Sequence, residues 1–284
     1  MHREEPLLFD CREESLLGIL ALPEKTSSSI GVIILVGGPQ YRIGSHRQFV
    51  LLARHLADNG ITALRFDFRG MGDSVGDSRD FEAVGDDIAA AIDALFRACP
   101  NLQRVVLWGL CDAASAALLY WQERRDPRLT GLALLNPWVR SESGLARTQI
   151  RHYYRDRLLQ GEFWRKLFSG RLYLRQSLGE ALGKLRHLAS GNRGDAAPDT
   201  AFQSRMLAAL HEFPGALLVI LSGNDYTARE FSDWADDHWR DRQNRPRLVY
   251  RQIDAADHTF SDADQRQQME DATRHWLQDI AENP

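Results

Sequence analysis

The sequence predicts an α/β protein with a mostly parallel central sheet, helices on both faces of that sheet, and a helical insertion late in the chain. Short apolar runs alternate with segments of helical period over most of the 284 residues. This alternation is typical of strand–helix–strand units, whose right-handed crossovers place helices on both faces of a parallel sheet. The alternation stops near residue 138 and resumes near residue 215, and this gap predicts the insertion.

The predicted strands share short apolar runs that end at turn residues, as at Gly-Gly-Pro after the second run. In chain order they cover 15–23, 31–39, 61–68, 104–109, 129–137, 215–225 and 247–254. The predicted helices share apolar side chains at helical spacing, as at Phe49, Leu52 and Leu56, and Asn59-Gly60 ends the first of them. These helices cover 46–60, 81–98, the segment after Cys111, and 262–281. A loop rich in Gly, Asp and Ser, 69–77, follows the third strand.

The insertion differs in composition from the rest of the chain. We expect a core made of 1–137 and 213–284, and a helical cap over 138–212, which contains many Arg, Leu and Tyr residues. Its stretch 147–176 interleaves Arg and Lys with aromatic residues. One interpretation is a lid whose aromatic side chains pack on the core while its charges stay solvated. The other is a basic mouth for an anionic substrate, such as a carrier phosphopantetheine arm or an acidic sugar.

Composition excludes several classes of protein. The net charge is 35 − 39 = −4, which does not predict nucleic-acid binding. No apolar run approaches the roughly 20 residues of a transmembrane helix, and the charged N-terminus does not resemble a signal peptide, so we expect a cytoplasmic protein. The three cysteines have no CxxC spacing, and no HxxH motif occurs, so we expect neither a disulfide framework nor a metal or other cofactor. The sequence does not indicate an oligomeric state.

The strongest local signal is Gly109-Leu110-Cys111-Asp112-Ala113, which lies where a predicted strand turns into a predicted helix. A nucleophile on such a sharp turn needs small neighbours two residues before and after it. The N-terminus of the helix that follows favours a thiolate at Cys111. The backbone N–H groups of Asp112 and Gly38 are the expected oxyanion hole. The Asp112 carboxylate opposes the thiolate electrostatically, and it is also a good helix cap.

A thiol nucleophile needs a base, and the base needs a group that orients it. His258 lies in a polar loop after the last predicted strand, and it is the best candidate among nine histidines. Asp225 ends the preceding strand and is the candidate acid, although it can also cap a helix. Asp254 and Asp257 are closer to His258 in sequence, but their direction is less predictable. The order nucleophile, acid, histidine is then Cys111, Asp225, His258.

Together these motifs resemble the α/β-hydrolase superfamily, which has the same order of catalytic residues. "VGGPQ" (36–40) is similar to its oxyanion loop and "DFRGMGDS" (67–74) to another of its loops, in which Asp67 and Arg69 are expected to be structural. The chain departs from the family at Cys111, where serine is usual, at Val36, where many relatives have histidine, and at Ala113, where glycine is usual. The motifs are also similar to a narrower bacterial group, the exosortase A system-associated hydrolases of type 1. That group is defined by gene neighbourhood and sequence, so the resemblance implies no substrate.

These residues predict an acyl hydrolase that works through an acyl-thioester on Cys111. Esters and thioesters suit a thiolate, because a tetrahedral intermediate on an amide would expel sulfur rather than the amine. The alternatives are an acyltransferase with the same three residues and a non-catalytic relative that binds a ligand or partner. The expected substrate is a small-molecule or carrier-bound acyl compound. Gln40, Arg42 and His46, which follow the oxyanion loop, are candidate substrate contacts.

Overall fold

The structure is a computed structural model that describes residues 2–25, 28–38, 40–140 and 200–283. The chain divides into two compact units, one made of 1–140 and 201–284 and the other of 141–200. The described residues belong almost entirely to the first unit. Within them, no helix is both long and apolar enough to cross a membrane.

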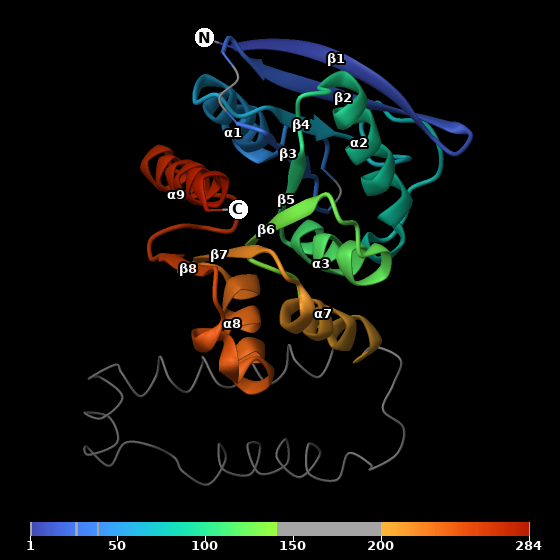
Figure 1. The fold of residues 1–284 in the computed structure, drawn as a ribbon. Helices are drawn as coiled ribbons and strands as arrows, with labels where there is room; N and C mark the ends of the chain where they lie inside the picture. Colours follow the sequence, from blue (N-terminus) through green and yellow to red (C-terminus); the bar gives the residue numbers. More distant parts are fainter. Residues whose placement is uncertain (1, 26–27, 39, 141–199, 284) are drawn as a thin grey trace, which may run out of the picture. The chain divides into compact units, whose positions relative to one another are not determined.

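An eight-stranded sheet forms the centre of the first unit, with the strand order β1-β2-β4-β3-β5-β6-β7-β8 (Figure 1). Its strands are β1 (His2–Cys11), β2 (Glu14–Pro23), β3 (Ile30–Leu35), β4 (Ala63–Phe66), β5 (Arg104–Leu110), β6 (Leu129–Leu135), β7 (Ala216–Ser222) and β8 (Leu248–Ile253). β1 and β2 pair antiparallel, as do β2 and β4, and every other pair is parallel. The predicted α/β fold with a mostly parallel sheet is confirmed.

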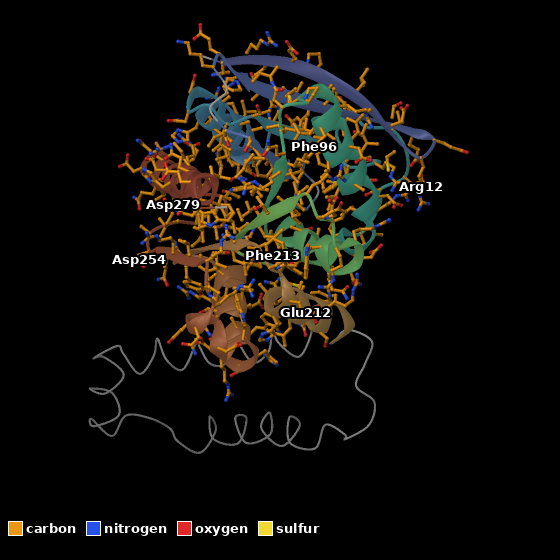
Figure 2. All side chains as sticks on the ribbon, viewed as in Figure 1. Arg12, Phe96, Glu212, Phe213, Asp254 and Asp279 are labelled. Atoms are coloured by element: carbon orange, nitrogen blue, oxygen red, sulfur yellow. The ribbon has the colours of Figure 1, made fainter. Side chains whose placement is uncertain are left out.

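Helices cover both faces of this sheet (Figure 1). On one face lie α2 (Gly85–Ala98), α3 (Asp112–Arg124), α7 (Thr200–Glu212) and α8 (Tyr226–His238); on the other lie α1 (Gln48–Asp58) and α9 (Ala263–Glu282). Alternate residues of β3 supply the two cores, with Ile33 and Leu35 on the first face and Val32 and Ile34 on the second. Because both faces are covered, β3 is apolar along its whole length. Figure 2 shows Phe213 inside this packing, whereas Asp254 and Asp279 lie at the periphery.

Among the described residues, one strand and one α-helix were not among the sequence predictions, nor was the 3₁₀ helix Arg240–Asn244. β1 carries Arg3, Glu4 and Glu5, and it pairs with β2 along its full length at one edge of the sheet. An edge strand tolerates charged side chains because one of its sides faces solvent. The second is α8, a helix of 13 residues that Asp225 caps through the N–H groups of Thr227 and Ala228.

Most of the expected cap, 138–212, falls on residues 141–199, which lie outside the described residues, and so does the basic aromatic stretch 147–176. The end of that range, however, is the helix α7, which packs on the sheet unit. Met206 and Leu210 are fully buried in the core, and Phe202 meets Phe81 edge-on with ring centroids 5.5 Å apart. This helix therefore belongs with the core rather than with an insertion.

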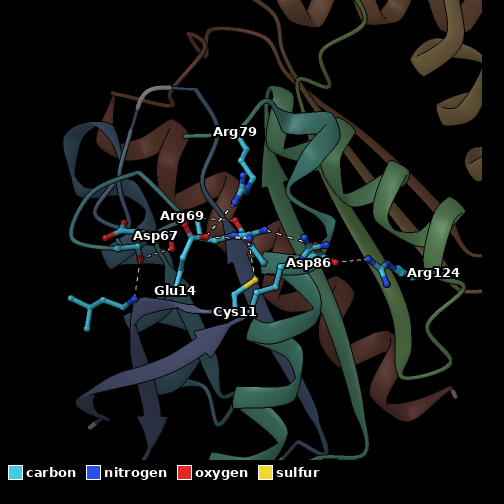
Figure 3. Close-up of polar contacts among 11 residues, drawn as sticks. Cys11, Glu14, Asp67, Arg69, Arg79, Asp86 and Arg124 are labelled. Carbon is cyan, nitrogen blue, oxygen red and sulfur yellow. Dashed lines mark hydrogen bonds and ion pairs between the residues drawn. The ribbon is translucent and has the colours of Figure 1, made fainter. Parts of the chain in front are cut away.

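The loop 67–74 is held by a buried network of charges (Figure 3). Arg69, only 2% exposed, donates to Asp87 and to Glu14 Oε2, the latter at 3.3 Å. The Cys11 thiol donates to Asp87 Oδ1 at 3.2 Å. Burial, together with the Asp87 carboxylate, raises the pKa of Cys11 to about 12, so this thiol is a poor nucleophile. The network connects the β1–β2 turn, this loop and α2, which is the structural role expected of Arg69.

Candidate active site

Cys111 lies on the sharp turn between β5 and α3. Its backbone angles are φ 64° and ψ −127°, a conformation that L-residues rarely adopt and that persists only where the surroundings impose it. The Cys111 N–H donates to Leu135 O at 2.9 Å, which fixes the turn to the end of β6. A Cβ atom at Gly109 would lie 2.6 Å from the backbone of Ala113. The turn therefore requires the glycine two residues before Cys111.

His258 and Asp225 meet although they are 33 residues apart in the chain. His258 lies in the loop between β8 and α9, and its Nδ1 is 2.8 Å from Asp225 Oδ2. Asp225 also accepts the backbone N–H groups of Thr227 at 3.3 Å and Ala228 at 3.0 Å. The carboxylate thus both caps α8 and orients the imidazole, the two roles considered for it from the sequence.

The alternative acids are occupied elsewhere. Asp254 accepts a hydrogen bond from Gln252 at 2.7 Å, and Asp257 accepts those of Thr259 and Ser261 within its own turn. Asp225 is therefore the carboxylate that contacts the imidazole.

Asp225 and Cys111 favour the protonated form of the His258 imidazole. The hydrogen bond to Asp225 and the contact with Cys111 raise the pKa of His258 to about 10, against the opposing effect of burial. Cys111 and His258 also line one cavity of about 520 Å³, together with Gly38, Asp112 and Trp138. The structure therefore brings the three residues Cys111, His258 and Asp225 together.

The expected oxyanion hole lies on the wall of the same cavity, but the Asp112 carboxylate occupies it. Gly38, with φ 60°, donates its N–H to Asp112 Oδ1 at 2.8 Å and to Oδ2 at 3.0 Å. Burial raises the pKa of Asp112, whereas hydrogen bonds from the N–H groups of Gly38, Ala113 and Asp112 itself lower it. A Cβ at Gly37 would lie 2.5 Å from Asp112 Oδ1, so glycine at that position lets the carboxylate reach Gly38. Sequence reasoning found both residues but not this contact.

The three candidate substrate contacts have different surroundings. Gln40 lines the 520 Å³ cavity and an adjacent one of about 450 Å³. Arg42 is only 13% exposed, and its guanidinium is paired with Asp67 and with Asp73. Two carboxylates thus already neutralise the charge of Arg42, and its contact with substrate stays a prediction. His46 lies in the short 3₁₀ helix Ser45–Arg47 and lines neither cavity.

Asn136 is a buried residue near the site that the sequence did not reveal. Its Nδ2 donates to Ser222 Oγ at 2.9 Å and to His258 O at 3.2 Å, and its Oδ1 accepts the Ser222 N–H at 2.8 Å. Asn136 therefore ties the end of β6 to the end of β7 and to the backbone of His258. The only signal in the sequence was an amide residue directly after an apolar strand.

No group of three or more His, Cys, Asp or Glu side chains in the described part of the chain is arranged to hold a metal ion.

The fold is that of the α/β hydrolases, and the strand–turn–helix elbow at Cys111 has the form on which that fold carries its nucleophile. The model of the Alpha/beta hydrolase family matches residues 32–272, and the chain belongs to this family. A comparison with curated proteins gives no significant match.

Solved structures of low sequence identity share the fold. An esterase from Pyrococcus furiosus is 17% identical, with a TM-score of 0.63 over 98% of this chain and 91% of that one. Est1E from Butyrivibrio proteoclasticus, with ferulic acid bound, is 14% identical, with a TM-score of 0.61 over 96% and 98%. An α/β serine hydrolase without a lid from Xanthomonas campestris is 17% identical, with a TM-score of 0.57 over 98% and 95%.

Proposed function

We propose that the protein is an acyl hydrolase of the esterase or thioesterase type, with Cys111 as nucleophile, His258 as acid and base, and Asp225 as the group that orients His258. One observation carries this proposal. The imidazole that Asp225 holds at 2.8 Å shares a cavity wall with a cysteine on a strained elbow turn. Family membership and the similarity in fold to an esterase support the same reaction class.

The proposed reaction has two halves. The Cys111 thiolate attacks the acyl carbon, and the N–H groups of Gly38 and Asp112 stabilise the oxyanion. The imidazolium of His258 gives its proton to the departing alcohol or thiol, which leaves the acyl group on sulfur as a thioester. The neutral imidazole then takes a proton from water as the water attacks the thioester. Collapse of that intermediate releases the acid and restores the thiolate beside the imidazolium.

The nucleophile favours esters and thioesters as substrates. A thiolate is a better leaving group than an amine, so the intermediate formed on an amide returns to substrate more readily than the one formed on an ester or thioester. An alkoxide or thiolate of the substrate leaves with the help of the His258 proton. The substrate proposed is therefore a small-molecule or carrier-bound acyl ester or thioester.

Intact-mass analysis tests the nucleophile. Wild type, Cys111→Ala and Cys99→Ala are incubated with p-nitrophenyl esters and acyl thioesters of increasing chain length. We expect an acyl adduct on wild type and on Cys99→Ala, and none on Cys111→Ala. Adduct decay in water supports the hydrolase, whereas decay that needs an added alcohol or amine supports an acyltransferase. Turnover that persists in Cys111→Ala, or the absence of both adduct and turnover, would overturn the proposal.

A further inference from the structure

The oxyanion hole contains a side chain of the protein itself. Both oxygens of the Asp112 carboxylate accept the N–H of Gly38, at 2.8 and 3.0 Å, and the N–H groups of Ala113 and Asp112 also favour its ionised form. The carboxylate therefore holds the donors that the acyl oxygen needs in the proposed reaction. Asp112 and Gly38 lie on the wall of the cavity that contains Cys111 and His258, so carboxylate and substrate compete for one place.

We propose that Asp112 determines substrate specificity: its carboxylate closes the oxyanion hole to neutral acyl groups, and acyl groups with an amine next to the carbonyl displace it. This inference rests on the proposed acyl-transfer chemistry at Cys111. The ligand class that it names is an aminoacyl ester or thioester.

The proposed specificity depends on what the Asp112 carboxylate contacts after a substrate has displaced it from the oxyanion hole. When a carbonyl oxygen takes the Gly38 N–H, the partly buried Asp112 carboxylate loses a hydrogen bond. Among the described residues no cationic side chain pairs with Asp112 to replace that bond. A partly buried charge that loses a hydrogen bond is destabilised, so a neutral acyl group meets a penalty on binding.

An amine on the α-carbon removes this penalty. Its nitrogen lies about one hydrogen-bond length from the carbonyl oxygen, and therefore close to a carboxylate that has just left the oxyanion position. The ammonium group donates to the carboxylate in a charge-assisted hydrogen bond that replaces the one from Gly38. The same carboxylate thus opposes one acyl group and favours another of nearly equal size.

The test compares matched thioesters, S-glycyl- and S-propionyl-N-acetylcysteamine, which differ in an ammonium against a methyl group. At about pH 6.5 the amine is protonated. For each enzyme, kcat/KM for the glycyl substrate is divided by kcat/KM for the propionyl substrate. The measured quantity is this ratio in wild type divided by the same ratio in Asp112→Ala. The intrinsic reactivity of each substrate cancels in this quotient. We expect a quotient of about ten or more, equivalent to about 1.4 kcal/mol, with faster turnover of the propionyl substrate in the variant.

Two further variants keep the proposal falsifiable. Asp112→Asn retains the shape of the side chain while it loses the charge, so it should also lower the preference for the glycyl substrate. It replaces Asp112→Ala if that variant does not fold. Asp80→Asn is the matched control, because Asp80 lines the same two cavities but caps a 3₁₀ helix through Glu82 instead of contacting Gly38. It should leave the preference close to that of wild type.

The outcomes are distinct. A quotient near one, with turnover that still depends on Cys111, overturns the role of Asp112 and leaves the proposed function intact. An equal loss of preference in Asp80→Asn also overturns it, since the cause would then be the general negative charge of the cavity. If neither substrate gives Cys111-dependent turnover in any variant, the proposed function itself fails.

Discussion

Replacing Asn136 by alanine should damage both stability and catalysis, because one buried side chain holds two strand ends and the backbone of His258. The variant loses the hydrogen bonds to Ser222 Oγ, Ser222 N–H and His258 O, which are 2.9, 2.8 and 3.2 Å long. It also leaves the N–H of Ser222, a residue that is 2% exposed, without its acceptor. Because Ser222 is buried, its N–H cannot bind water in place of the lost acceptor.

The expected loss follows from these contacts. Each buried hydrogen bond contributes about 1 kcal/mol net, and an abandoned buried donor costs about 1–3 kcal/mol. Asn136 has φ 43°, a conformation that asparagine tolerates better than alanine by about 1 kcal/mol. Two hydrogen bonds, the abandoned Ser222 N–H and the backbone conformation contribute about 2, 1–3 and 1 kcal/mol, so we expect Asn136→Ala to lower the free energy of unfolding by about 4–6 kcal/mol. Displacement of His258 should lower kcat/KM for a thioester by roughly ten- to a hundredfold.

Urea denaturation and steady-state kinetics measure the two effects. Asn59→Ala is the matched control, since the Asn59 side chain donates one exposed hydrogen bond to His55 O at 2.8 Å. It should change the free energy of unfolding by less than about 0.5 kcal/mol and leave the kinetics unaltered. A loss of less than about 1 kcal/mol in Asn136→Ala, with normal kcat/KM, would refute the assignment of Asn136 as a positioning residue.

Three further measurements test the charged groups of the fold and the site. Arg69→Met leaves the buried Asp87 carboxylate without its cationic partner and should lower the free energy of unfolding by about 3–5 kcal/mol. Arg124→Met at the surface should lower it by less than about 1 kcal/mol. Equal losses in the two variants would contradict the buried network. Burial raises the pKa of Glu270 to about 7, from 4.5 when unfolded, so its ionisation destabilises the fold as pH rises. Glu270→Gln should therefore gain on the order of 2 kcal/mol over wild type at pH 8 and nothing at pH 4, and a gain independent of pH would contradict this. NMR titration should give a pKa near 10 for His258, and Asp225→Asn should lower it towards 6.5. The stability gained from this pair should be fully present below about pH 6.5 and lost as pH rises through 10, and a titration near 6.5 in wild type would be evidence against the pairing.

The strands in the middle of the sheet were predictable because burial on both faces leaves a continuous apolar run. β5, β6 and β7 carry such runs, and each was predicted within three residues of its observed ends. β1 gave no such signal. Its stability comes from pairing with β2 and from ion pairs such as that of Glu4 with Arg65, 2.9 Å apart, and these partners are distant in the sequence.

The site was predictable to the extent that backbone topology determines it. Parallel strands end at one edge of a sheet, so residues that follow β5, β7 and β8 meet there. Cys111, Asp225 and His258 are such residues. The pairing of Arg42 with Asp67 and Asp73 was not predictable, because the positions of these two carboxylates depend on the path of a loop.

Asp112 marks the point at which the sequence alone stops being informative. Its place after the nucleophile predicts a backbone N–H aimed at the oxyanion, and a carboxylate at a helix start predicts a cap. Both inferences concern the local chain, whereas the contact that matters crosses 74 residues to Gly38. That contact needs a glycine at position 37 to give the carboxylate room, which no local pattern indicates. Asp225 and Asp112 thus have different proposed roles. Asp225 orients the imidazole of His258, and Asp112 occupies the oxyanion hole.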